Sequence, residues 1–223
     1  MTHLKRINAP KSWPIERKVK KFIIRPLPGP HKITESMPLG VILREILKLG
    51  KKDRDNHIIL NNKEVLVNNK VIINSKFPVG ILDTLSIPSL NKYYRMMYTL
   101  RGKLNLEDIP KEESNNQICK IIGKTILKKG KIQLNLYNST NIIVEKDVYK
   151  VKDTLILKDN KITKHLKFEK DAFVYLIGGK HMGHKAKVID FKKYPGFSKD
   201  IITIKINEEI HETLSDYAYV IEK

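Results

Sequence analysis

The apolar positions in the first half of the chain predict two helices. Between residues 39 and 47 apolar side chains recur at the spacing of one helix face, and Gly50 follows as a stop signal. The other side of this helix and the residues just after it carry the cations Arg44, Lys48, Lys51 and Lys52. A second, shorter helix is expected over residues 53–60.

After the second helix the pattern changes to short runs that are typical of strands. We expect strands at 64–67 and 70–73, joined by a tight hairpin at Asn68-Asn69, because asparagine tolerates the positive φ that such turns require. A third strand is expected at 79–87, and Pro88 ends it. Two helices followed by a small sheet make a compact, basic α+β module.

The rest of the chain predicts mostly strands. Short β-type runs occur at 93–100, 117–122, 131–137, 141–145 and 154–157, and the acidic stretch 107–117 between them is expected to be a loop with room for one helical turn. From residue 169 onward, runs at 172–177, 185–190, 201–206 and 217–221 predict a compact barrel, and an acidic tail ends the chain.

The first 36 residues follow neither period. Two proline-rich stretches, residues 9–14 and 25–31, force extended or turn geometry, with basic residues between them. The segment has little core of its own, which leaves two alternatives: a disordered, solvated tail, or a segment that orders on RNA. Trp13 and Phe22 favour the second, and we expect the free protein to be partly disordered here.

The charge of the chain points to a polyanionic partner. Its 223 residues include 43 Lys or Arg against 24 Asp or Glu, a formal net charge of +19, and the surplus is concentrated toward the N-terminus. A membrane partner would need an apolar run of about 18 residues or a basic amphipathic helix with aromatic anchors. Neither is present, so a cytoplasmic location is expected. The single cysteine, Cys119, excludes an internal disulfide and is expected to be buried.

Several motifs along the whole chain resemble the S4e family of archaeal and eukaryotic small-subunit ribosomal proteins. The N-terminal signature is carried by His3-Leu4-Lys5-Arg6, Ala9-Pro10-Lys11-Ser12-Trp13 and Arg25-Pro26-Leu27-Pro28-Gly29-Pro30-His31. The central part is similar at Asn91-Lys92-Tyr93-Tyr94-Arg95 and Val151-Lys152-Asp153-Thr154. The last part resembles a KOW motif at Ile177-Gly178-Gly179-Lys180-His181-Met182-Gly183, although His184 and Ala186 stand where the family continues with Arg and Gly.

The resemblance implies an α+β, multi-module protein of archaeal-type length. Its parts would be an extended basic N-terminal segment (1–38), a small α+β RNA-binding module like that of the bacterial-type small-subunit protein four (39–104), a central all-β domain (105–168) and a C-terminal SH3-like β-barrel with the KOW motif (169–223). It also implies a structural constituent of the small ribosomal subunit that supports translation and performs no catalysis. Its partners would be small-subunit rRNA and neighbouring ribosomal proteins, with no membrane, no small-molecule substrate and no cofactor.

Candidate RNA-binding residues follow from charge and from position. Cations neutralise phosphates, and planar side chains stack on exposed bases. In the N-terminal segment and the folded modules we predict RNA contacts from Lys5, Arg6, Lys11, Trp13, Arg17, Lys18, Lys20, Lys21, Arg25, Arg44, Lys48, Lys51, Lys52, Arg95 and Lys180. Tyr93 and Tyr94 are further stacking candidates. For all three aromatics, ordinary hydrophobic packing is the alternative.

Two other classes of protein compete with this interpretation. An RNA-modifying enzyme is one, because the module resembled by residues 39–101 also occurs beside catalytic domains; here no nucleophile-base pair is recognisable, and Gly178-Gly179-Lys180 is too short for a phosphate-binding loop. His181 and His184 lack further ligands that would close a zinc shell, so no metal site is expected. A KOW-containing transcription or assembly factor is the other.

Overall fold

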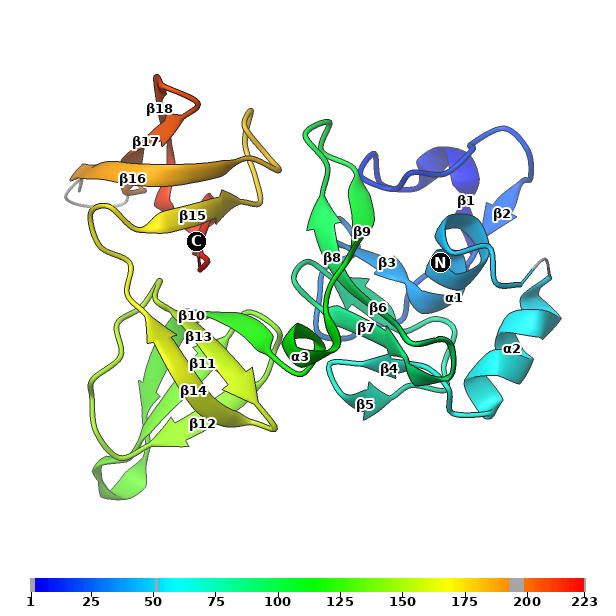
Figure 1. Ribbon diagram of the computed structural model, residues 1–223, viewed down its shortest axis with the longest axis horizontal. Helices are drawn as coiled ribbons and strands as arrows, with labels where there is room; N and C mark the ends of the chain where they lie inside the picture. Colours follow the sequence, from blue (N-terminus) through cyan, green and yellow to red (C-terminus); the bar gives the residue numbers. More distant parts are fainter. Residues whose placement is uncertain (1–2, 51, 193–198, 223) are drawn as a thin grey trace. The chain divides into compact units, whose positions relative to one another are not determined.

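The computed structural model describes residues 3–50, 52–192 and 199–222, and the fold is mostly β with few helices (Figure 1). The chain forms two compact units: unit 1 ends at Gln117 and unit 2 begins at Ile118. Short 3-10 turns occur at Arg6–Asn8, Pro88–Leu90, Lys128–Gly130 and Ser215–Tyr217. Within these ranges no helix is long and apolar enough to cross a membrane.

The N-terminal segment belongs to unit 1 and is held there by contacts within the chain. Strand β1 (Leu4–Lys5) pairs antiparallel with β2 (Phe22–Ile23). Between them Trp13 is fully buried, and its indole Nε1 donates a 2.7 Å hydrogen bond to the carbonyl of Ser36. The one tryptophan of the segment therefore packs in an interior that the segment shares with the rest of unit 1, which agrees with the expectation that it has little core of its own.

The two expected helices are present, but the first departs from regular geometry. Helix α1 (Leu39–Val41) runs into a π-helical turn, Ile42–Ile46, whose widened backbone is seen in the 3.0 Å bond from the Leu47 amide to the Ile42 carbonyl. Helix α2 (Asp53–Asn61) agrees with the prediction to within one residue. Leu39, Ile42 and Leu43 are fully buried, as the spacing of apolar residues indicated.

The sheet of unit 1 has the strand order β5-β4-β7-β8-β9 (Figure 1). Its strands are β4 (Leu66–Val67), β5 (Lys70–Val71), β7 (Thr84–Ile87), β8 (Lys92–Tyr98) and β9 (Leu104–Asp108), and the short helix α3 (Lys111–Ser114) follows. The hairpin at Asn68-Asn69 is confirmed, with φ of 49° and 63°.

One strand prediction in unit 1 was wrong. Residues 79–87 form two strands: β6 (Pro78–Gly80) pairs with β3 (Ser36–Pro38), whereas β7 belongs to the larger sheet. The chain turns between them at Leu82, which has a φ of 65°, and the Asp83 carboxylate accepts a 2.8 Å bond from the Gly80 amide. Apolar side chains continue through this turn because it is buried, so the hydrophobic pattern alone does not reveal the break.

Unit 2 contains two five-stranded antiparallel sheets. The first has the order β12-β11-β10-β13-β14 and buries Cys119, as expected, with Ile121, Leu134 and Leu155. Its strands are β10 (Gln117–Ile126), β11 (Ile132–Leu136), β12 (Asn141–Val144), β13 (Thr154–Lys158) and β14 (Lys161–Leu166).

The second sheet of unit 2 has the order β18-β17-β16-β15-β19. Its strands are β15 (Phe173–Leu176), β16 (Lys185–Lys192), β17 (Ile201–Ile206), β18 (Glu209–Leu214) and β19 (Ala218–Val220). The acidic end of the chain contains strand β18, which was not among the predicted strands and which pairs with β17 along six residues. β18 is an edge strand, and its charged residues Glu209 and Glu212 are typical of such an edge.

Candidate RNA-binding surface

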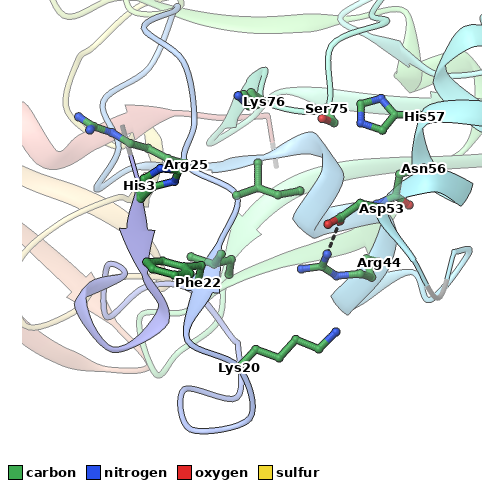
Figure 2. Close-up of a pocket in the computed structure, with 12 residues that line it drawn as sticks. His3, Lys20, Phe22, Arg25, Arg44, Asp53, Asn56, His57, Ser75 and Lys76 are labelled. Carbon is green, nitrogen blue, oxygen red and sulfur yellow. Dashed lines mark hydrogen bonds and ion pairs between the residues drawn. The ribbon is translucent and has the colours of Figure 1, made fainter. Parts of the chain in front are cut away.

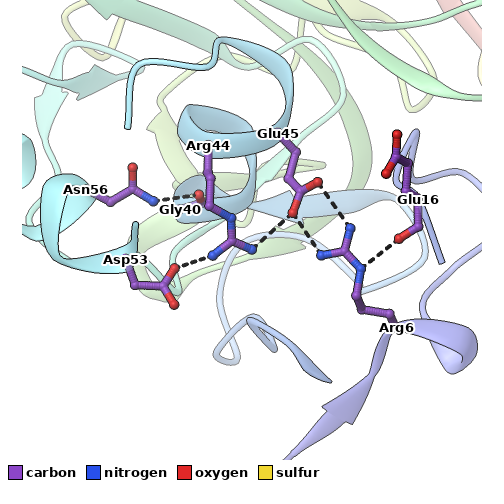
Figure 3. A network of polar contacts seen from close by, with 7 residues as sticks. All are labelled: Arg6, Glu16, Gly40, Arg44, Glu45, Asp53 and Asn56. Carbon is purple, nitrogen blue, oxygen red and sulfur yellow. Dashed lines mark hydrogen bonds and ion pairs between the residues drawn. The ribbon is translucent and has the colours of Figure 1, made fainter. Parts of the chain in front are cut away.

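The described cations fall into two groups, one used inside the fold and one exposed. Arg6 is the clearest member of the first group, with 3% of its surface exposed. Its guanidinium makes a bidentate pair with Glu45, at 2.8 and 3.1 Å, and its Nε donates to the Glu16 carbonyl at 2.7 Å (Figure 3). The hydrogen bond with Glu45 raises the pKa of Arg6. This arginine holds the N-terminal segment against the first helix.

Arg44 extends the same network. Its Nη2 lies 3.1 Å from the Glu45 carboxylate, and its Nη1 pairs with Asp53 at the start of α2 (Figure 3). The hydrogen bond from Arg6 is the main cause that lowers the pKa of Glu45, and Arg44 adds to it. Arg44 therefore links the first helix to the second through Asp53, while its contact with Glu45 stays within the first helix.

Three more predicted RNA contacts are also occupied within the chain. The Arg17 guanidinium donates to the carbonyls of Ala9 and Pro10, at 2.7 and 2.8 Å, and Arg95 donates to the carbonyl of Glu113. Burial is the main cause that lowers the pKa of Arg95. Trp13, fully buried, has no free face for a base. Trp13 and Arg6 are both buried and bonded within the chain, which fits the packing alternative for Trp13; as RNA contacts, both stay predictions.

The remaining predicted cations are on the surface. These side chains are exposed: Lys5, Lys11, Lys18, Lys20, Lys21, Arg25, Lys48, Lys52 and Lys180. Lys51 lies outside the described residues. Tyr94 is 8% exposed, which fits the packing alternative, and Tyr93 is half-buried. As RNA contacts, the exposed side chains stay predictions.

Some of these cations line a groove of about 480 Å³, which we call the basic groove (Figure 2). Strand β2 and its flanks contribute Lys20, Phe22 and Arg25, helix α2 contributes His57, and the turn before β6 contributes Lys76. The carbonyl of Lys76 accepts a 2.9 Å bond from the Leu27 amide, which fixes this turn beside the proline-rich stretch. Two further hollows, of about 480 and 420 Å³, share Arg25 with the groove.

The basic groove is electropositive, and most of its cations are exposed to solvent. Four Lys or Arg side chains and one carboxylate are found among its described lining residues, and that carboxylate, Asp53, is already paired with Arg44. Within the part of the chain that the structure describes, the side chains of Lys20, Arg25 and Lys76 make no recorded ion pair or hydrogen bond. Such a site attracts anions, and its concave shape strengthens the local field.

Sequence reasoning missed several lining residues of the groove. Lys76, His57 and the exposed ring of Phe22 were not among the predicted contacts. Lys76 is 51 positions from Arg25 in a different segment of the chain, so no local pattern brings the two together. The strand alternation that exposes Phe22 and buries Ile23 is only two residues long, which is too short to recognise before the pairing with β1 is known.

Unit 2 presents a smaller cluster around the predicted contact Lys180. The rings of His181 and His211 stack with centroids 4.1 Å apart, and His184 lies 6.1 Å from His181. Burial is the main cause that lowers the pKa of His181, and the nearby His211 and Lys180 lower it further. Among the described residues no group of three or more His, Cys, Asp or Glu side chains has the arrangement of a metal site.

Comparisons with known proteins agree with this architecture. The family model described as "Ribosomal family S4e" matches residues 90–162, and the model described as "RS4NT (NUC023) domain" matches residues 2–34. The chain is 39% identical over 230 residues to small ribosomal subunit protein eS4 of Methanocaldococcus jannaschii, covering 98% of this chain and 93% of that protein. It is 40% identical over 223 residues to eS4 of Methanocella arvoryzae, covering 99% and 94%.

A solved structure is similar as well. The crystal structure of the 30S ribosomal protein S4e from Thermoplasma acidophilum superimposes with a TM-score of 0.72 and 28% identity, covering 84% of this chain and 95% of that one. Together with the sequence matches, this fold defines the chain as a ribosomal protein. It belongs to the ribosomal family S4e, which confirms the resemblance carried by the sequence motifs.

Proposed function

We propose that the protein is a structural constituent of the small ribosomal subunit in the cytoplasm, where it binds small-subunit rRNA and neighbouring ribosomal proteins. The observation that carries the proposal is the basic groove of unit 1, where Lys20, Arg25 and Lys76 are exposed and, among the described residues, are engaged by no other side chain. Cations held on a folded surface gain affinity by releasing the counterions of RNA phosphates. Membership of a ribosomal family sets aside the alternative of an RNA-modifying enzyme.

We also propose a role for each segment of the chain. Residues 1–38 and 39–104 would supply the main rRNA surface, residues 105–168 a central β domain, and residues 169–223 an SH3-like barrel with a KOW motif. The barrel assignment is supported by the antiparallel sheet from β15 to β19. In the connection between β15 and β16, Gly179 and Gly183 have φ of 80° and 87°. A Cβ at Gly178 would lie 2.6 Å from the Tyr217 ring, so this turn requires its glycines.

Ultraviolet crosslinking in cells, with sequencing of the attached RNA and mapping of the crosslinked peptides, tests the partner and the surface together. We expect crosslinks confined to small-subunit rRNA, with peptides from residues 1–60 prominent. The protein should also co-sediment with mature small subunits through high-salt washing. Crosslinks spread over tRNA or nascent messenger RNA, or release by the wash, would instead support a transcription or assembly factor.

A triple variant tests the groove as the source of affinity. Replacing Lys20, Arg25 and Lys76 by glutamine should weaken rRNA binding and make log affinity less steep against log salt by roughly 0.7–0.9 per lost phosphate contact. The matched control replaces Lys63, Lys92 and Lys111, three exposed lysines of unit 1 outside the groove. Equal losses in both triple variants would show that net charge, and not the groove, determines the affinity.

A further inference from the structure

Phe22 is an aromatic side chain of which about half is exposed to solvent. In the two-residue pairing of β1 with β2, Ile23 turns inward and is 7% exposed, whereas Phe22 turns outward and is 49% exposed. The ring lines the basic groove (Figure 2), and it also lines one of the adjoining hollows. What sets Phe22 apart from other exposed apolar side chains is that its aromatic ring lies in a concave site lined by cations.

The surroundings of Phe22 are those of a stacking platform. The His3 ring lies 5.7 Å from it, centroid to centroid, tilted by 50°, and the Lys21 ammonium is 5.3 Å from the ring centroid. A cation beside an aromatic face is a combination that proteins use to hold single-stranded nucleic acids, because every base offers a π-face and every linkage offers a phosphate. The chemistry therefore matches a nucleotide better than a purely apolar ligand.

The groove also has a volume and charges that suit a nucleotide. Its volume of about 480 Å³ lies in the range of about 300–1,000 Å³ typical of sites for small-molecule-sized ligands. Lys20 and Arg25 approach from either end of β2, and Lys76 approaches from the turn before β6. The three exposed cations thus line the same groove as the exposed ring.

A paired RNA helix does not fit this arrangement. In an A-form duplex the bases are stacked on each other, and side chains reach mainly phosphates and 2′-hydroxyls. A ring recessed in a groove contacts a base only when that base is unpaired and turned out. We propose that the basic groove binds an unpaired nucleotide of rRNA, with its base stacked on Phe22 and its phosphate held by Lys20, Arg25 and Lys76. This rests on the proposed function, which it makes more specific.

Fluorescence of the full-length Phe22→Trp variant tests the stacking directly. The chain's own Trp13 is fully buried and gives a constant background, which wild-type protein measures. A single-stranded octamer of adenosine should quench the new tryptophan, whereas an RNA duplex of eight base pairs at equal phosphate concentration should not. Equal quenching by both RNAs, no quenching by either, or equal quenching by polyglutamate would overturn the proposal; the last result would indicate an acidic protein segment as occupant.

A second pair of variants tests the stacking on Phe22 without the tryptophan reporter. Phe22→Leu preserves an apolar side chain but removes the stacking face, and we expect about 5- to 150-fold weaker binding of the octamer, with an unchanged salt slope. Val19→Ala is the control, because Val19 is 64% exposed in the same segment and lies outside the groove. Equal affinities of Phe22→Leu and wild type would contradict the proposal.

Co-sedimentation separates this proposal from the broader one. If wild-type protein remains on small subunits but the octamer experiments fail, the proposed ribosomal function stands and the nucleotide site is ruled out. Wild-type protein that binds the octamer but not small subunits would contradict the ribosomal proposal instead, and with it the claim that the nucleotide belongs to rRNA.

Discussion

The imidazole Nε2 of His31 lies 2.9 Å from Oδ2 of Asp83, and both side chains are almost completely buried. Asp83 also accepts bonds from the Gly80 amide and from the Asn68 side chain, at 2.8 and 2.7 Å. The pair thereby fastens the end of the proline-rich stretch to the turn between β6 and β7. Close packing supports it, because a Cβ on Gly80 would lie 2.2 Å from the His31 ring.

This pair predicts a pH-dependent stability. Burial lowers the pKa of His31, but the charge and the hydrogen bond of Asp83 outweigh it, so that the pKa is raised above 6.5. The stabilisation by the charged pair is fully present below pH 6.5 and is lost as pH rises through the raised value. In urea unfolding, the unfolding free energy of wild type should exceed that of His31→Gln by up to about 3–5 kcal/mol at low pH. This difference should shrink as the pH becomes alkaline. His57→Gln, at an exposed position of α2, is the control. A difference independent of pH would show that His31 has the same pKa in the folded and the unfolded chain, and a difference that shrinks toward low pH would show that the fold keeps His31 neutral; either result would contradict the charged pair.

The pair between Arg6 and Glu45 predicts how firmly the N-terminal segment is held. In Arg6→Gln the bidentate contact with Glu45 and the hydrogen bond from Nε to the Glu16 carbonyl are lost, so trypsin should cleave at Lys18, Lys20 and Lys21 sooner than in wild type. Lys5→Gln alters an exposed neighbour on β1 and should leave the cleavage rate unchanged. Immediate cleavage of RNA-free wild type at these lysines would restore the expectation of a disordered segment and contradict the docking.

Local patterns were sufficient for much of the fold. Helix α2, the Asn68-Asn69 hairpin and most strands of unit 2 follow from residue spacing and turn chemistry, because these features depend on neighbours only a few positions apart. The ribosomal family followed from motifs spread over the chain. The same patterns did not reveal the break at Leu82, since a buried turn carries the same apolar residues as a buried strand.

The candidate surface was less predictable, because it depends on long-range contacts. Arg6 and Lys20 are equally basic in the sequence, yet one is buried against Glu45 and the other is exposed in the groove. Only the fold separates a structural arginine from an available lysine. Trp13 likewise fits stacking and packing equally well until the Ser36 carbonyl is placed beside its indole nitrogen.

The tight turn predicts opposite effects at its two asparagines. Asn68 has a φ of 49°, and its amide bonds to buried Thr84 and to Asp83, so Asn68→Gly should cost about 1–3 kcal/mol of unfolding free energy. Asn69 has a φ of 63°, and its side chain makes a long 3.4 Å bond to the Asn115 carbonyl. Asn69→Gly should therefore be neutral or stabilise by up to about 1 kcal/mol. Urea unfolding measures both, and a loss at Asn69 as large as at Asn68 would contradict the assigned roles.

Lys120 joins the two sheets of unit 2 from a buried position. Its Nζ donates to the carbonyls of Ser215, Asp216 and Ala218, at 3.2, 2.9 and 2.7 Å, and lies 5.0 Å from the Tyr219 ring centroid. Burial is the main cause that lowers its pKa from 10.5 to about 8, and Asp216 opposes the shift. Three donated bonds satisfy the ammonium, but its transfer out of water still costs free energy at neutral pH.

This lysine predicts a gain in stability at alkaline pH. Between pH 8 and 10.5 the unfolded chain holds the proton that the folded chain has released, so the contribution of Lys120 to the unfolding free energy rises with pH, by at most about 3 kcal/mol. Other lysines also titrate there, so the measured quantity is the difference between wild type and Lys120→Met, with the exposed Lys158→Met as control. We expect that difference to shift in favour of wild type as pH rises from 8 to 10.5. A constant difference would mean that the three carbonyls keep the ammonium charged at its ordinary pKa, and that the buried cation is fully compensated by its hydrogen bonds.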